Sequence, residues 1–236
     1  MATGLAVAAG AGMLSGCTVI NDITNAVNTM EANRSIINAF NKNLKSGEKV
    51  AFEATYVTTG NAPVTVIYAV DPPKEVDFQE APSRPGTQAG NNAFDLVANS
   101  SGGYSCSPSS SGAGSGWSCT KLGNTKSVVQ SGVVAIYTPA HWIAFLDVVA
   151  IAAGLAGDSV KSTHETINGF AMDCVDLVVQ HVSGTSTLCT TSQGILGYVH
   201  AAGDSTSFEI RSYTKSPPAS VFELPAGATI TSPSTS

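Results

Sequence analysis

The residues with the most distinctive chemistry in this chain of 236 residues are its five cysteines, four of which form two close pairs. Cys106 and Cys119 flank a Gly/Ser-rich segment, and Cys174 and Cys189 flank a short connection through residues 183–185. Four cysteines allow three pairings, and sequence proximity favours disulfides Cys106–Cys119 and Cys174–Cys189, each joining two strands of a hairpin. A zinc site is the rival, but neither pair has the two-residue spacing or the nearby histidine of such a site. Disulfides persist in oxidising compartments, so the pairs predict an exported protein.

The four histidines, which could act as general acids or bases, are scattered along the chain at His141, His164, His181 and His200. No His-Glu-x-x-His zinc pair and no Gly-x-Ser-x-Gly nucleophile motif occurs in the sequence. On a strand, His164 and Glu165 would point to opposite faces, which argues against an acid–base pair. We therefore predict a protein that is not an enzyme, with no catalytic residues, no metal site and no cofactor.

The fifth cysteine, Cys17, ends the tetrapeptide Leu-Ser-Gly-Cys at residues 14–17. This tetrapeptide resembles the cleavage site of bacterial lipoproteins, in which a lipid is attached to the cysteine thiol and the preceding peptide is removed. Residues 4–14 are small and apolar and resemble the apolar core of an export signal. No Lys or Arg precedes Arg34, so we interpret residues 1–16 as a signal peptide truncated at its start. The alternative is a buried Ala-rich helix that contains a cysteine by chance.

The resemblance of Cys17 to a lipidated cysteine implies a location and a partner. The protein would be held by its lipid at the extracytoplasmic face of a bacterial cell membrane. The apolar segment before Cys17 is too short and too rich in Ala and Gly to be a stable membrane span.

The composition limits the partners that the remaining chain can bind. Eleven Lys and Arg against 17 Asp and Glu give a net charge of −6, and phosphate binding needs a basic face, so nucleic acid is a poor partner. The length suits one domain with a real core, and no linker or repeat divides it. We expect a single exported domain over residues 17–231, a disordered tail over 232–236, and a monomer.

The hydrophobic pattern changes period along the chain. Apolar residues at three- and four-residue steps from Ile20 to Leu44 predict an amphipathic helix that ends at Gly47. A period of two then predicts successive hairpins, interrupted by a helical segment over residues 125–156. The expected strands are Val50–Thr59, Val64–Val70, Glu75–Glu80, Ala93–Asn99, two around Cys106 and Cys119, Val160–Ile167, Phe170–Gln180, Thr185–Thr191, Ile195–Ala201 and Ser205–Tyr213, with a short final element at Val221–Leu224. Hairpins in succession predict a mainly β fold with helices (α+β), in which helices cover the concave face of a curved antiparallel sheet.

The second half of the helical segment is the most apolar run after Cys17, and Asp147 is its one charge. One side of this helix carries Trp142, Phe145, Leu146, Val149 and Ala153. Ile143, Val148, Ile151 and Leu155 spread over much of the other side. A helix that covers one face of a sheet needs one apolar stripe, so the second stripe must contact protein, a ligand, a membrane or a partner. The plain alternative is a helix packed between the sheet and the first helix.

The element order and the closing segment Pro217–Ala228, with its Phe-x-x-Pro-x-Gly phrase, resemble two related groups. These are the periplasmic lipoprotein-carrier family and the mycobacterial lipid-carrying lipoproteins. The cysteine hairpins resemble lipoproteins of actinobacteria. The resemblance implies an incomplete barrel around an apolar cavity that helices close.

Two functional hypotheses follow from the sequence. The first is a membrane-anchored lipoprotein that binds a hydrophobic ligand, a lipid or a lipidated partner, as a carrier or chaperone. Its ligand would contact Trp142, Phe145, Leu146, Val149 and Ala153, and burial would contribute roughly 0.8 kcal/mol per methylene. The second is a non-enzymatic protein-interaction or signalling module of the cell envelope, with the same fold and no ligand cavity.

Overall fold

The fold is built around one long antiparallel sheet. The computed structural model describes residues 16–60, 63–82, 93–109, 116–156, 159–178 and 183–231. Twelve strands form the sheet in the order β12-β6-β5-β4-β3-β2-β1-β11-β10-β9-β8-β7. The strands are β1 (Phe52–Thr58), β2 (Val64–Asp71), β3 (Glu75–Pro82), β4 (Phe94–Asn99), β5 (Gly102–Pro108), β6 (Trp117–Gly123), β7 (Ser159–Ile167), β8 (Phe170–Val178), β9 (Ser186–Thr191), β10 (Leu196–His200), β11 (Ser207–Lys215) and β12 (Thr229–Thr231).

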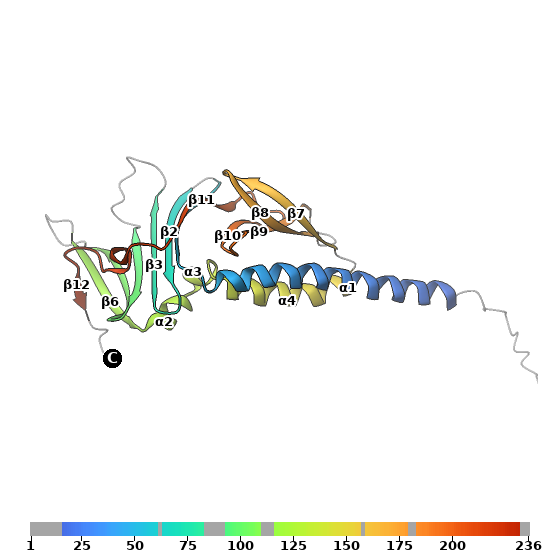
Figure 1. Cartoon of the computed structure of the whole chain (residues 1–236), viewed down its shortest axis with the longest axis horizontal. Helices are drawn as coiled ribbons and strands as arrows, with labels where there is room; N and C mark the ends of the chain where they lie inside the picture. The colour runs from blue at the N-terminus through green and yellow to red at the C-terminus, as the bar shows by residue number, and fades with distance from the viewer. Residues whose placement is uncertain are drawn as a thin grey trace, which may run out of the picture.

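The sheet is open, with β12 and β7 at its two edges, and it bends over the helices (Figure 1). Neighbouring strands are antiparallel, apart from β12, which pairs with β6 in parallel. The prediction of a mainly β protein with a few helices is confirmed. The parallel edge strand was not predicted, and the expected element at Val221–Leu224 is instead a 3₁₀ helix, η1 (Ala219–Phe222).

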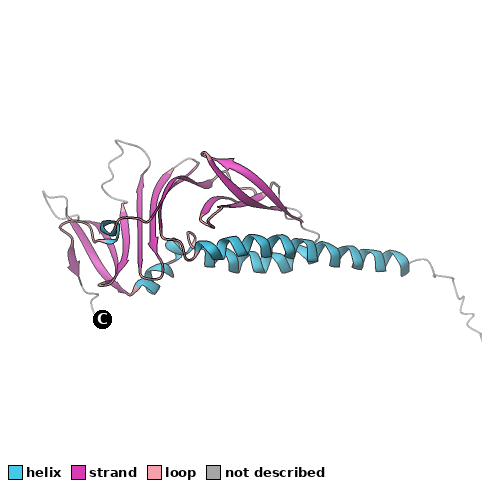
Figure 2. Cartoon of the chain, in the orientation of Figure 1, coloured by secondary structure: helices cyan, strands magenta, loops and turns pink. Residues whose placement is uncertain are grey.

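The helices are α1 (Gly16–Gly47), α2 (Thr125–Val129), α3 (Gly132–Ala135) and α4 (Pro139–Ala156). They lie on one side of the sheet (Figure 2). The helical segment predicted over residues 125–156 is thus three helices. The side chain of Asn124 caps α2 by accepting a hydrogen bond from the Ser127 amide at 3.1 Å, and Pro139 opens α4, where a missing N–H costs nothing.

Two apolar clusters fill the space between sheet and helices. In the first, the ring of Tyr137, which follows α3, lies 5.3–5.8 Å from the rings of Tyr56, Tyr68, Phe78 and Phe208. The second cluster joins α1 and α4 to strands β7–β10, and Ile37, Leu44 and Leu146 are fully buried in it. Helices α1 and α4 lie side by side, and both contact β7 (Figure 1).

Both predicted disulfides are present. Cys106 and Cys119 are cross-strand partners on β5 and β6, and Cys174 and Cys189 are partners on β8 and β9. Each pair therefore joins neighbouring antiparallel strands, as the spacing along the chain predicted. The bonds indicate an oxidising environment outside the cytoplasm.

Three predictions fall at or beyond the described residues. Most of the proposed signal peptide, residues 1–15, lies outside them, and so does the tail over 232–236. Cys17 lies in the first turn of α1, in a part of the helix whose side chains the structure does not describe.

Candidate functional site

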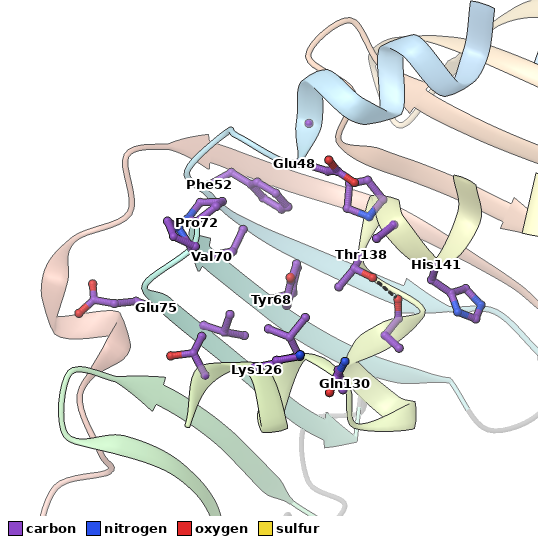
Figure 3. Close-up of a pocket in the computed structure, with 18 residues that line it drawn as sticks. Glu48, Phe52, Tyr68, Val70, Pro72, Glu75, Lys126, Gln130, Thr138 and His141 are labelled. Carbon is purple, nitrogen blue, oxygen red and sulfur yellow. Dashed lines mark hydrogen bonds between the residues drawn. The ribbon is translucent and has the colours of Figure 1, made fainter. Parts of the chain in front are cut away.

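A cavity of about 790 Å³ opens between the sheet and the helices (Figure 3). Its floor consists of side chains from β1, β2 and β3, and its other walls come from the end of α1, from α2 and α3, and from the first turn of α4. The apolar lining residues are Phe52, Tyr68, Val70, Pro72, Pro73, Val76, Val129, Ala135, Pro139 and Ala140.

Alternation along the strands explains the apolar floor. Side chains at every second position share a face, so Phe52 on β1, Tyr68 on β2 and Val76 on β3 point to the same side. Their side chains are nearly completely buried, and the rings of Phe52 and Tyr68 meet edge to face at 5.7 Å. The floor of the cavity is therefore apolar, although these three side chains expose little surface to it.

The phenol groups beside the cavity stay neutral. Burial raises the pKa of Tyr68 and Tyr56 well above the ordinary value. Burial, and then the neighbouring Glu80, raises the pKa of Tyr137 to about 12. Tyr56 donates its hydroxyl to the Leu196 carbonyl at 2.9 Å. These groups therefore give the inner wall no charge at neutral pH.

Polar groups are found at the mouth. Glu48, Glu75, Lys126 and His141 line the cavity from α1, β3, α2 and α4. Thr125 Oγ1 donates a 3.0 Å hydrogen bond to the Lys74 carbonyl, which ties α2 to the β2–β3 turn. An apolar interior with a charged mouth can hold an amphiphile whose head group stays at the entrance.

Four of the five ligand-binding residues predicted on α4 do not line this cavity. Leu146 is fully buried against α1 and the sheet, and Trp142 and Val149 are half-buried beside it. Phe145 is 45% exposed. Ala153 lies in the part of α4 whose side chains are not described. It is the first turn of α4, at Pro139 and His141, that borders the cavity.

Phe52 on the cavity floor could have been found from the sequence, because it falls on the apolar side of the alternating pattern of β1. The register of β7 on β8 was not predicted, although their pairing as a hairpin was. It places His164 opposite Asp173, with Nδ1 2.7 Å from Oδ1. Both side chains are exposed. Of the other histidines, His200 is half-buried, with Nδ1 3.3 Å from the Thr206 carbonyl oxygen, and His181 lies outside the described residues.

Neither a metal cluster nor a membrane-spanning helix is found among the described residues. No group of three or more His, Cys, Asp or Glu side chains there could hold a metal ion. No helix in the described part of the chain is long and apolar enough to cross a membrane.

Comparisons with known proteins identify no family. No family model and no curated protein matches the chain. An uncharacterised conserved protein from Thermus thermophilus is similar in structure, with a TM-score of 0.43 and 8% identity. The match covers 85% of this chain and 99% of that protein.

Proposed function

We propose that this protein binds a hydrophobic ligand non-covalently in the cavity between β1–β3 and helices α2–α4. The observation that carries the proposal is the combination of an apolar interior of about 790 Å³ with charged groups at its mouth. Burial of each ligand methylene contributes roughly 0.8 kcal/mol, so an acyl chain gains affinity with length until the cavity is full.

The size of the cavity favours one small ligand. Pockets for single small molecules span about 300–1,000 Å³, and this cavity falls within that range. A single-chain amphiphile fits this volume, with its chain on Phe52 and Tyr68 and its head group near Lys126 or His141. The open, curved sheet with helices on its inner side supports the incomplete barrel expected for such a carrier.

The proposed site of action is the extracytoplasmic face of the cell membrane. Two disulfides support export, and the Leu-Ser-Gly-Cys tetrapeptide supports a lipid anchor on Cys17. In this proposal the protein is a monomeric, non-enzymatic carrier or chaperone, and its partners are the membrane and a lipid or lipidated molecule.

A second candidate function rests on the exposed side of α4. Phe145 and Val148 are 45% and 67% exposed, and residues three positions apart on a helix are neighbours on its surface. Such a surface supports the alternative of an envelope protein-interaction module. In that case the cavity would be empty in the cell.

One experiment separates the two functions. The untethered domain is purified, extracted with organic solvent, and the extract is analysed by mass spectrometry. Retention of a fluorescent fatty acid is then measured for Val70→Gln, on the cavity floor, and for Val148→Gln, on the exposed side of α4. A carrier yields lipid in the extract and loses retention in Val70→Gln alone. An extract without lipid, with no retention by the folded wild type, would refute the carrier proposal.

A further inference from the structure

A second cavity, of about 540 Å³, lies on the face of the sheet opposite the helices. The closing segment after β11 covers it, and η1 contacts β3 and β4 there. Asn99 holds this segment by donating a 2.7 Å hydrogen bond to the Phe222 carbonyl. The lining residues are Glu53, Ile67, Gln79, Glu80, Ala93, Phe94, Asp95, Trp117, Ser220, Val221, Glu223, Leu224, Pro225 and Ala226.

Acidic groups gather at this cavity from several elements. Glu53 on β1, Asp95 on β4 and Glu223 on the closing segment line it, and no Lys, Arg or His is among its described lining residues. Glu80 borders it from β3, although alternation turns its side chain towards Tyr137. Lys121, on the same face of the sheet, lies 6.0 Å from the ring of Tyr104 and does not line the cavity.

Asp95 is buried beside a second acid, Asp77, which does not itself line the cavity. Asp77 is 0% exposed and Asp95 is 4% exposed, on neighbouring strands β3 and β4. Gln79 donates a 3.0 Å hydrogen bond to Asp77 Oδ2. Oδ1 of Asp77 and Oδ1 of Asp95 receive no hydrogen bond from a described N–H or O–H group. The two carboxyl groups can form a hydrogen bond with each other only if they share a proton.

Burial, reinforced by the neighbouring acids, explains how the pair holds that proton. Desolvation, then the charge of Asp95, raises the pKa of Asp77 to about 9. Desolvation raises the pKa of Asp95 to about 6, although its hydrogen bond with Asp77 opposes this shift. A buried carboxylate without a positive partner is costly, and a cation in the adjoining cavity would remove this cost.

We propose that this cavity binds an organic cation, in the form of an alkylammonium or guanidinium group. Asp95 and Glu53 would balance its charge, and Ile67, Trp117 and Leu224 would contact its apolar body. The cavity is much larger than a bare metal ion, and its apolar walls offer such an ion no ligands. Among the described residues, no group of three or more His, Cys, Asp or Glu side chains could hold a metal ion here.

Binding exchanges one positive charge for another. The cation enters, the shared proton leaves Asp95 and Asp77 for solvent, and the net charge of the site is unchanged. Affinity therefore rises with pH over the range in which the pair still holds its proton, by up to tenfold per pH unit for one displaced proton.

Isothermal titration calorimetry of the wild type tests this proposal with n-butylammonium, the neutral analogue butanol, a lysine-containing tripeptide, and Ca²⁺. We expect butylammonium to bind and butanol not to bind, with affinity increasing from pH 5 to pH 8. A tripeptide that binds more tightly than butylammonium assigns the cation to a partner's lysine. A tripeptide that binds more weakly than butylammonium assigns the cation to a free amine.

Variants locate the binding site. Asp95→Asn and Glu53→Gln should each weaken butylammonium binding at least tenfold, and Glu165→Gln, which removes an exposed carboxylate from β7, should leave it unchanged. Glu53 is only half-buried, so Glu53→Gln keeps the test valid if Asp95→Asn fails to fold. The proposal is overturned if amines give no binding heat, if Ca²⁺ binds while amines do not, or if a folded Glu53→Gln variant binds like the wild type.

Discussion

The side-chain amide of Asn41 on α1 donates a 2.9 Å hydrogen bond to the carboxylate of Asp147 on α4. Asp147 is the one charge in the apolar run of α4, and Asn41 is 4% exposed. The bond adds a directional contact to the apolar packing of α4 on α1. Leu146, the neighbour of Asp147, lies in the cluster with Ile37 and Leu44.

The first prediction concerns this hydrogen bond. Asn41→Ala should lower the free energy of unfolding by about 1–3 kcal/mol, because a hydrogen bond to a charged group contributes more than a neutral one. Urea denaturation measures the loss. Asp147→Asn, which can still accept the bond, should lose less, and Lys42→Ala on the exposed side of α1 should match the wild type. Equal stability of Asn41→Ala and Lys42→Ala would contradict the prediction.

The second prediction concerns the disulfides, whose cysteines are 13 and 15 residues apart. Replacing both cysteines of a pair with alanine should cost about 3 kcal/mol of unfolding free energy in the chain-entropy model, which gives this value for a loop of some 15 residues. Peptide mapping without reductant checks the pairing first. A peptide that joins Cys106 to Cys174 or Cys189 would show that the bonds differ from those described.

The third prediction concerns pH. The pKa of Asp77 is raised on folding, to about 9, so its contribution to stability is full below about pH 4 and is lost as pH rises towards 9. Asp77→Asn cannot ionise and can still donate to Asp95. Its stability relative to the wild type should increase by ~2–3 kcal/mol between pH 6 and pH 8, because the folded wild type holds one proton more than its unfolded chain over these two pH units. Denaturation at several pH values measures this difference, with Glu165→Gln as the control; parallel profiles for all three proteins would speak against a shared proton.

The fourth prediction concerns Cys17. In a bacterial host, with a complete export signal placed upstream, the wild type should fractionate with membranes. Cys17→Ser should appear in the soluble extracytoplasmic fraction, because the thiol that would carry the lipid is missing. Metabolic labelling with a fatty acid gives an independent measurement. A Cys17→Ser protein that remains in the membrane fraction would rule out the lipid anchor.

The sequence predicted those features that depend on neighbouring residues. Alternation from Val50 to Thr59 predicted β1, and the spacing of the cysteines predicted both disulfides, because each acts between adjacent strands. The break that separates α3 from α4 was missed, since the residues around it remain apolar. The parallel pairing of β12 was missed as well, because Thr229–Thr231 is too short to show a period.

The positions of both cavities could not be predicted from local patterns. The cavity between sheet and helices depends on how α1 and α4 pack against each other. Leu146 is buried in that packing, and the open space lies beside Pro139 instead. The buried acids were missed for another reason. A charged residue in an alternating strand normally indicates the exposed face, and Asp77 and Asp95 are buried by a segment more than a hundred residues further along the chain.

The length of α1 sets the distance between Cys17 and the cavity at the other end of the helix. The helix has 32 residues, which is about 48 Å at 1.5 Å per residue, and its first part extends beyond the end of the sheet (Figure 1). The cavity between sheet and helices lies at the opposite end of α1, beside Gly47 and Glu48. If a lipid on Cys17 holds the start of the helix, α1 is a rigid arm whose tilt sets the height of the mouth above the bilayer. Upright, the arm would present the cavity to the next layer of the envelope, and lying flat it would bring the mouth to the membrane surface.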